Sequence, residues 1–366
     1  MNLDYFLTTS SNWMQASGAE SDIVMSTRIR LARNLAHYRF PLSFTEDEAK
    51  LIENIMVKAL LQAPQQSAFS YFEMKDLPLL QRQMLVEKHL ISPALAKEQK
   101  QGAVFIAKDE ALSVMVNEED HIRIQCLMSG LQLQEAYKEA KQLDDSIATH
   151  VTYAYDQKFG YLTTCPTNVG TGLRASVMMH LPALTMTKQM PKLIQMITRL
   201  GMVVRGIYGE GSENLGNVYQ ISNQVTLGKS EEAILQELAQ LVDQIIAKER
   251  VTRKKLLQTA PISLEDRISR SYGVLKHARI ISSEEAAMCL SNVRLGVDLG
   301  LLPSIPYHLL NECLLFMQPA FIQQFAGTTL QPAERDIYRA KYLQQQLMTI
   351  QTNNTLKDKG DGSHDV

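Results

Sequence analysis

Residues 21–31 read SDIVMSTRIRL, a stretch in which apolar and polar side chains alternate. Alternation with a period of two residues is typical of a β-strand that buries one face. Two further runs, AVFIA at 103–107 and LSVMV at 112–116, are rich in strand-forming residues and are separated by a short polar turn. Residues 122–127 continue this pattern as a third strand. We therefore predict a largely antiparallel sheet that includes residues 21–31.

Helical patterns alternate with these strands. Residues 45–62 have apolar side chains at helical spacing, and Thr45 with Glu48 forms a capping box at their start. The other predicted helices are 79–90, 131–147, 176–200 (interrupted at Pro182 and Pro191) and 230–253, and the other predicted strands are 151–155, 202–208 and 218–221.

The pattern changes near residue 255. From residue 256 to residue 348 one helical pattern follows another, with prolines between them and no strand run. This change predicts an α+β fold, with helices flanking the sheet, followed by an all-helical domain. The expected parts are a polar lead-in at 1–20, the sheet domain at 21–255, the helical domain at 256–350 and a disordered tail at 351–366.

Composition excludes several classes of protein. The chain has 366 residues, of which 37 are Lys or Arg and 39 are Asp or Glu, so its net charge of −2 argues against binding to nucleic acid or to a membrane surface. No apolar run approaches the ~18–20 residues of a transmembrane helix. The four cysteines form no CxxC pair, and no Cys/His cluster suggests a metal site. We therefore expect a cytoplasmic protein with free thiols.

The chain lacks the glycine-rich loops that commonly bind phosphate. Neither GxxxxGK[ST] nor GxGxxG occurs. Arginines are placed to bind phosphate instead, because Arg28 and Arg30 lie two residues apart on a predicted strand and point to the same face. Like charges on one face repel unless they meet an anion such as a polyphosphate. The alternative is a strand edge with solvated charges.

Three other segments bring polar residues to strand ends. They read NEEDHIR at 117–123, CPTNVGTGLR at 165–174 and RGIYGEG at 205–211. The second can offer backbone N–H groups to an anion and contains a candidate reactive thiol, Cys165. The third is a glycine-flanked loop that presents one carboxylate, Glu210. Taken singly, the alternatives are a solvated turn, a buried cysteine and a hairpin turn.

Together the four segments favour phosphoryl transfer. They supply five arginines, at least two carboxylates and one thiol. Arginines that converge on a polyphosphate, with Mg²⁺ offsetting the remaining charge, would position and stabilise a transferring phosphoryl group. Carboxylates beside that site would suit a cationic acceptor.

These segments resemble those of the ATP:guanido phosphotransferase family, which includes arginine and creatine kinases, and they occur in the same order. The resemblance implies that ATP is bound with Mg²⁺ held mainly through the nucleotide, so that no residue is predicted to bind metal directly. It implies a guanidinium clamp of Glu119 and Glu210, with Glu119 as the base and the Cys165 thiol beside them. The ATP-binding residues that it implies are Arg28, Arg30, His89, Arg123, Arg174 and Arg205.

The departures from small-molecule members point to one branch of the family. Those enzymes carry a helical domain before the first strand, whereas here a helical domain follows the catalytic part. Gln220 stands where they have Asp, and Tyr208 where they usually have Arg. In these respects, and in the sequence RDIYRA at 335–340, the chain resembles the bacterial protein-arginine kinases.

That branch implies an allosteric phosphoarginine site formed by Arg335, Asp336 and Arg339. On a helix these residues are neighbours, so two guanidinium groups could hold one phosphate. The alternative is an exposed, salt-bridged helix face.

The branch also implies an activity, which is transfer of the ATP γ-phosphoryl group to arginine side chains of proteins in a stress response. The implied partners are substrate proteins, a stress-response repressor among them, a Clp-type unfoldase–protease, an activator protein and a second copy in a homodimer. Two alternatives remain, namely a kinase of free arginine or another small guanidino compound and a non-catalytic adaptor that binds phosphoarginine. A DNA-binding repressor is disfavoured by the charge balance.

Overall fold

The structure is a computed structural model that describes residues 3–61, 69–97, 101–206 and 215–360. Within these ranges the chain divides into two compact units. The described residues of the first unit lie within Met1–Met179, Gln189–Ser212 and Tyr219–Ala247, and those of the second lie within His180–Lys188, Glu213–Val218 and Lys248–Val366. The second unit thus takes two short segments from the part of the sequence that we assigned to the sheet domain.

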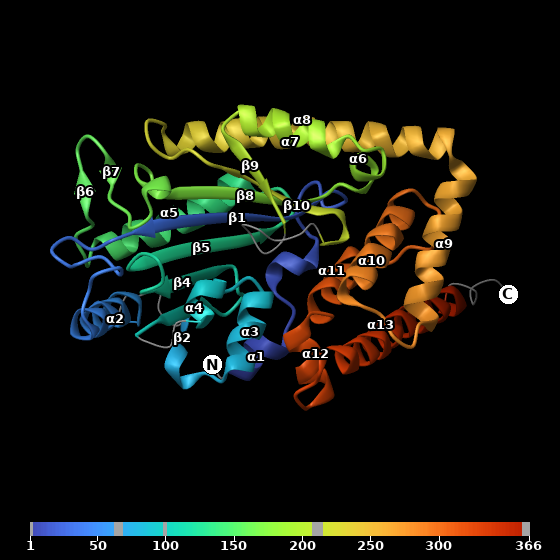
Figure 1. The fold of residues 1–366 in the computed structure, drawn as a ribbon, viewed down its shortest axis with the longest axis horizontal. Helices are drawn as coiled ribbons and strands as arrows, with labels where there is room; N and C mark the ends of the chain where they lie inside the picture. The colour runs from blue at the N-terminus through green and yellow to red at the C-terminus, as the bar shows by residue number, and fades with distance from the viewer. Residues whose placement is uncertain (1–2, 62–68, 98–100, 207–214, 361–366) are drawn as a thin grey trace. The chain divides into compact units, whose positions relative to one another are not determined.

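The main sheet has eight strands in the order β2-β3-β4-β5-β1-β8-β10-β9, and β1 lies between β5 and β8 near its middle (Figure 1). A separate two-stranded sheet pairs β6 (Tyr155–Asp156) with β7 (Gly160–Tyr161). The strands of the main sheet are β1 (Val24–Arg33), β2 (Phe69–Glu73), β3 (Ala103–Ala107), β4 (Leu112–Val116), β5 (Ile122–Ser129), β8 (Leu173–His180), β9 (Met202–Arg205) and β10 (Val218–Asn223).

Antiparallel register places the polar side chains of the central strands on one face. Arg30 on β1 lies opposite Gln125 on β5 and Arg174 on β8. Since directly opposed residues point to the same side, β1, β5 and β8 share a polar face. The other face is mainly apolar, and Ile29 and Leu31 are fully buried there. The predicted antiparallel sheet is therefore confirmed.

Helix α5 (Leu133–Ala148) covers the apolar face of β1 and β5. Arg33, which is on the same face as Ile29 and Leu31, is fully buried and makes a two-pronged ion pair with Asp144 of α5, at 3.1 and 2.8 Å. Its guanidinium also stacks on Tyr161, 3.6 Å from the ring centroid. With one face of the central strands sealed by α5, the arginine face is the one that can receive a ligand.

The capping box at the start of α2 (Glu46–Leu61) is confirmed. Thr45 Oγ1 accepts the backbone N–H of Glu48 at 3.2 Å, and the Glu48 carboxylate accepts that of Thr45 at 2.9 Å. The other helices of the first unit are α1 (Leu3–Thr8), α3 (Leu79–Glu87), α4 (Pro93–Lys97) and α7 (Met190–Arg199), with 3₁₀ turns at Asn12–Gln15, Met74–Asp76 and Pro166–Asn168.

The N-terminal segment is packed rather than a polar lead-in alone. Leu3, Phe6 and Leu7 of α1 are buried. Lys88, itself fully buried, donates to the backbone carbonyl groups of Phe6 and Thr9 and forms an ion pair with Glu110. The segment is thereby attached to the residue that precedes His89.

The predicted helix at 176–200 is wrong in its first part, because residues 173–180 form strand β8. All but one of these residues are buried, and β8 lies between β1 and β10 in the sheet. A short run of mostly buried residues cannot be told from a helix segment by periodicity alone. The predicted strand at 151–155 is reduced to a bridge between Tyr153 and Leu35, followed by β6.

The second unit is helical, as predicted for the C-terminal region. Its core includes Ala286, Leu290 and Val293 of α10, which are buried among the neighbouring helices. Helix α8 belongs partly to each unit, so the predicted boundary near 255 lies inside a helix. Helix α13 reaches Gly360, through part of the tail predicted to be disordered at 351–366. The helices are α6 (Pro182–Met186), α8 (Glu231–Thr259), α9 (Pro261–His277), α10 (Ser283–Asp298), α11 (Tyr307–Phe316), α12 (Pro319–Ala326) and α13 (Pro332–Gly360).

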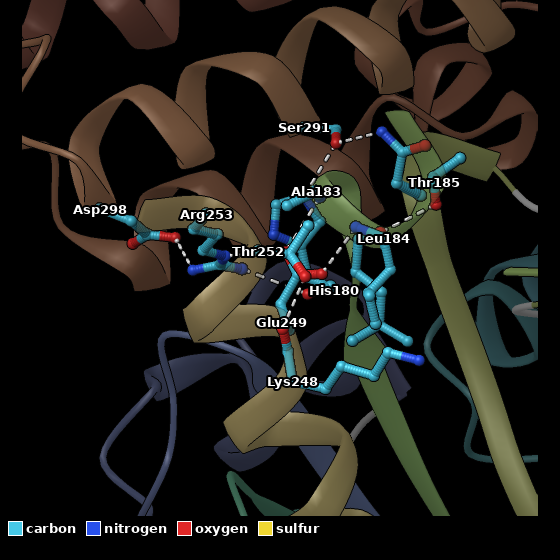
Figure 2. A network of polar contacts seen from close by, with 12 residues as sticks. His180, Ala183, Leu184, Thr185, Lys248, Glu249, Thr252, Arg253, Ser291 and Asp298 are labelled. Carbon is cyan, nitrogen blue, oxygen red and sulfur yellow. Dashed lines mark hydrogen bonds and ion pairs between the residues drawn. The ribbon is translucent and has the colours of Figure 1, made fainter. Parts of the chain in front are cut away.

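A buried polar network stabilises the second unit (Figure 2). Glu249 of α8 accepts two backbone N–H groups at the start of α6, both at 3.0 Å. Arg253, one turn later, pairs with Glu249 at 2.9 Å and with Asp298 of α10 at 2.8 Å, and donates to the His180 carbonyl at 3.3 Å. Each charge in this network has a hydrogen-bonded partner, as buried charges require. The network therefore joins α6, α8 and α10.

Candidate active site

Two cavities open on the arginine face of the sheet, and both are lined by Arg30, Arg123, Arg174 and Arg205. The first has a volume of about 360 Å³ and is otherwise lined by Arg28, Val86, His89, Ile91, Ser92, Pro93, Ala94, Met115, Glu118, Gln125, Gln220 and Ser222. The second has a volume of about 380 Å³ and is otherwise lined by Ala32, Glu119, Cys165, Thr167, Asn168, Gly172 and Gln224. The shared arginines thus separate a partly apolar cavity from one with a carboxylate and a thiol.

Arg28 and Arg30, which line the first cavity, lie close to other buried positive charges. Burial, together with the charges of Arg174 and Arg123, lowers the pKa of Arg28 to about 10. Burial and the neighbouring arginines hold the pKa of Arg30 well below its ordinary value. The Nε atom of Arg30 is buried and has no hydrogen-bond partner among the residues that the structure describes. An anion placed here would relieve the repulsion between the arginines and accept a hydrogen bond from the Arg30 Nε–H group.

Two adjacent carboxylates share Arg123 but differ in exposure. Arg123 contacts Glu118 at 2.8 Å and Glu119 at 2.7 Å. The Glu118 side chain is 3% exposed and also accepts a hydrogen bond from Ser92 at 2.6 Å, whereas the Glu119 side chain is 38% exposed. Glu118 therefore holds Arg123 in place, and Glu119 is available to an incoming cation.

Asp120 and His121, which we placed in the same cluster, support the turn from inside. Asp120 is fully buried and accepts hydrogen bonds from Asn34 at 2.7 Å and from the Thr164 backbone N–H at 2.6 Å. The His121 Nδ1 atom accepts the Leu35 backbone N–H at 3.0 Å, so its Nε2 atom donates to the Arg39 carbonyl at 2.9 Å. Burial lowers the pKa of His121. Through Thr164, Asp120 holds the Cys165 loop beside Glu119.

In the loop at 165–174, predicted as a possible anion cradle, five consecutive backbone N–H groups already have partners within this chain. The backbone N–H groups of residues 168–172 all donate to carbonyl groups of this chain. Gly170 has φ 115° and Gly172 has φ 64°, and a Cβ at either would lie within 2.5 Å of a backbone oxygen. The glycines therefore serve close packing. Cys165 is half-buried, and its Sγ atom lies 3.0 Å from Thr167 Oγ1.

His89 lies in the first cavity, just after α3, with φ 62°. Its backbone carbonyl accepts a hydrogen bond from Gln125 at 2.7 Å, which fixes it to β5. Burial and the charge of Arg28 lower the pKa of its imidazole to about 3. A neutral ring among Val86 and Ile91 is suited to contact with a nucleobase rather than with phosphate.

Sequence reasoning missed Ser92, Gln125 and Ser222, which line the first cavity. Glu118 and Gln220, which the sequence singled out without assigning a role, line it too, and the Gln220 Oε1 atom is buried without a hydrogen-bond partner among the described residues. The alternation on the strands predicted at 122–127 and 218–221 could have identified Gln125 and Gln220. Glu210 and Tyr208 lie outside the described residues.

The cluster predicted on the last helix is more buried than expected. Arg339 is 2% exposed, and it donates to the carbonyl groups of Met317 at 2.9 Å and Ile281 at 3.0 Å and forms an ion pair with Asp336. Arg335 is half-buried. Most of the Arg339 guanidinium is thus engaged within the second unit.

Among the residues that the structure describes, no group of three or more His, Cys, Asp or Glu side chains could hold a metal ion. None of the helices in the same part of the chain is long and apolar enough to cross a membrane.

Comparison with known proteins identifies the family. Residues 51–252 match the ATP:guanido phosphotransferase C-terminal catalytic domain, and residues 261–358 match the protein-arginine kinase McsB C-terminal domain. A protein-arginine kinase of Geobacillus sp. (strain WCH70) is 53% identical over 345 residues, which are 94% of this chain and 95% of the relative. The protein-arginine kinase of Halalkalibacterium halodurans is 53% identical over 356 residues, or 97% and 100% of the two chains.

Solved structures show the same fold. A lombricine kinase is 25% identical with a TM-score of 0.58, over 68% of this chain and 70% of that one. A duplicated taurocyamine kinase from Schistosoma mansoni, solved with bound transition-state analogue components, is 25% identical with a TM-score of 0.59, over 74% of this chain and 39% of that one. The chain therefore belongs to the ATP:guanido phosphotransferase family and, within it, to the protein-arginine kinases, which are phosphotransferases.

Proposed function

We propose that the chain transfers the γ-phosphoryl group of Mg·ATP to arginine side chains of protein substrates. The observation that carries the proposal is the pair of cavities with four arginines in common. A nucleotide in the first cavity and a guanidinium in the second would face each other across those arginines. Phosphoryl transfer depends mainly on positioning and on stabilising charge, which such an arrangement supplies.

The first cavity would bind the nucleotide. His89, Val86 and Ile91 offer a neutral, partly apolar surface to the base. The residues proposed to bind the phosphates and the transferring group are Arg28, Arg30, Arg123, Arg174 and Arg205. Mg²⁺ would arrive bound to ATP, where it neutralises phosphate charge.

The second cavity would bind the acceptor. The guanidinium of an arginine has a pKa above ~12, so it stays protonated at neutral pH. In that form it is a poor nucleophile. The half-exposed Glu119 carboxylate would accept an N–H of the substrate arginine and take its proton as the N–P bond forms and the bond to ADP breaks. Cys165 lines the same cavity. Glu210, which lies outside the described residues, is proposed as the second carboxylate of the clamp.

The proposals that follow, on domain roles, location, partners and physiological role, are supported by family membership. We propose a catalytic domain at 21–255 and a helical domain at 256–350, in which Arg335, Asp336 and Arg339 bind phosphoarginine. We also propose cytoplasmic location, a homodimer, an activator protein and a role in a stress response in which phosphorylated proteins pass to a Clp-type protease.

Mass spectrometry at neutral pH tests the activity, because the N–P bond is acid-labile. The protein is incubated with Mg·ATP and either an unfolded arginine-bearing protein or free arginine. Phosphate on protein arginines with free arginine unchanged supports the proposal. Phosphorylated free arginine alone would identify a small-molecule kinase, and no transfer to either would refute the proposed activity.

A further inference from the structure

A third cavity, of about 580 Å³, adjoins the second one and shares Glu119 and Cys165 with it. Its other wall comes from the segment before α2, through Pro41, Leu42 and Phe44. An acceptor arginine whose guanidinium reached Glu119 would therefore have this cavity beside it. Neither the nucleotide nor the guanidinium, as placed above, uses this space.

The segment before α2 is held in a fixed conformation. The Phe44 ring stacks on His121, with centroids 6.1 Å apart and planes 18° apart, and the carbonyl of Phe40 accepts the backbone N–H of Ser43 at 2.8 Å and of Phe44 at 3.0 Å. Leu42 at the tip of this turn is nevertheless 86% exposed. From this ordered turn beside the cavity, Leu42 can bury apolar surface against a side chain that enters the cavity.

The charge of the third cavity narrows the choice of partner. Its described lining includes Glu46, Glu118 and Glu119 and no lysine or arginine. Glu118 and Glu119 are already paired with Arg123, so an acidic side chain placed here would meet the exposed Glu46 carboxylate, whereas an apolar one could pack on Leu42 and Phe44. The surface thus combines apolar contact with rejection of negative charge.

We propose that the third cavity binds the substrate polypeptide immediately beside the target arginine and selects an apolar side chain there against an acidic one. This inference rests on the proposed function, since it needs an arginine held at Glu119. In an extended chain neighbouring residues rise ~3.3 Å each, so a residue one or two positions away can reach an adjoining cavity. Free arginine has no such neighbour.

Peptides of equal length with one arginine test the proposal. The residue beside the arginine is Leu, Ala or Glu, and kcat/KM for phosphate incorporation is measured with saturating Mg·ATP. Packing on Leu42 should favour the Leu peptide over the Ala peptide by about fivefold to tenfold, since roughly 50 Å² of apolar surface would be buried. The Glu peptide should be poorer than the Ala peptide.

Substitutions in the protein test whether Leu42 causes the preference for the Leu peptide. Leu42→Ser should bring the ratio of kcat/KM for the Leu peptide to that for the Ala peptide close to one. Leu79→Ser should leave this ratio unchanged, because Leu79 is 57% exposed but lies outside the cavity. Glu46→Gln should reduce the discrimination against the Glu peptide. Equal rates for the three peptides, or a Leu-to-Ala ratio that survives in Leu42→Ser, would overturn the inference while leaving the kinase activity established. No transfer to any peptide or unfolded protein would refute the proposed function itself and, with it, this inference.

Discussion

Replacing Glu119 by Gln separates chemistry from nucleotide binding and from folding. The substitution keeps the size of the side chain and removes the proposed base, which should lower the transfer rate by about a hundredfold to ten-thousandfold. Stability should fall by less than about 1 kcal/mol, because the Glu119 side chain is 38% exposed and a solvent-screened ion pair contributes little. Arg123 keeps its second partner, Glu118, at 2.8 Å. The affinity for ATP should therefore remain close to that of the unaltered protein.

The assay follows phosphate incorporation into an unfolded arginine-bearing protein by mass spectrometry at neutral pH, with ATP affinity measured separately by nucleotide titration. Glu118→Gln is the matched control, since the Glu118 side chain is 3% exposed and bonded to both Arg123 and Ser92. It should destabilise the protein by about 2–3 kcal/mol and weaken ATP binding. A Glu119→Gln variant that turned over at the normal rate would refute the assignment of the base. Loss of ATP binding in that variant would refute the division of roles between the two carboxylates.

Three further predictions concern electrostatics. Arg30→Gln should weaken ATP binding by about a hundredfold, because a charge-assisted hydrogen bond to phosphate is lost. The same substitution should raise the unfolding temperature of the protein without nucleotide, because it relieves repulsion among buried arginines. Nucleotide titration measures the first effect, and thermal unfolding measures the second. His89 and His180 are neutral in the fold, since burial lowers the pKa of His89 to about 3 and that of His180 well below its ordinary value. In the unfolded chain both histidines bind protons below about pH 6.5. The unfolding free energy should therefore fall between pH 6.5 and pH 3, by up to about 1.4 kcal/mol per pH unit for each histidine. Denaturant titrations at several pH values measure this unfolding free energy. Arg339→Ala should destabilise the second unit by about 3 kcal/mol, because Arg339 is buried and bonded to two backbone carbonyl groups. Arg335→Ala should change the stability by less than about 0.5 kcal/mol, and thermal unfolding measures both changes. Arg335→Ala is therefore the better variant for a test of phosphoarginine binding.

Local pattern predicted much of the fold. The hairpin at 103–107 and 112–116 has the predicted bounds, and the capping box of Thr45 and Glu48 forms as expected. Both signals are short-range, because turn spacing and side-chain caps depend on residues only a few positions apart. Strand β8 was missed for the opposite reason, since the strands on either side of it in the sheet, β1 and β10, are remote in sequence.

The loop at 165–174 illustrates a second limit. Its glycines and polar residues are equally consistent with an anion cradle and with a tightly packed turn. Only the tertiary structure shows that the amides of 168–172 already donate to carbonyl groups of the chain. A free backbone donor cannot be recognised from residue type, because its partner is chosen by the rest of the fold.

The sequence by itself determined that Arg28 and Arg30 share a face, since a strand repeats every two residues, and that the C-terminal region is helical. The tertiary structure decided what lies opposite them, through a register that sets Arg174 beside Arg30. It also decided which carboxylate is buried, Glu118, and which remains open, Glu119. Burial depends on elements that pack together from distant parts of the chain, so two neighbouring glutamates of identical chemistry acquire different roles only when the fold is complete.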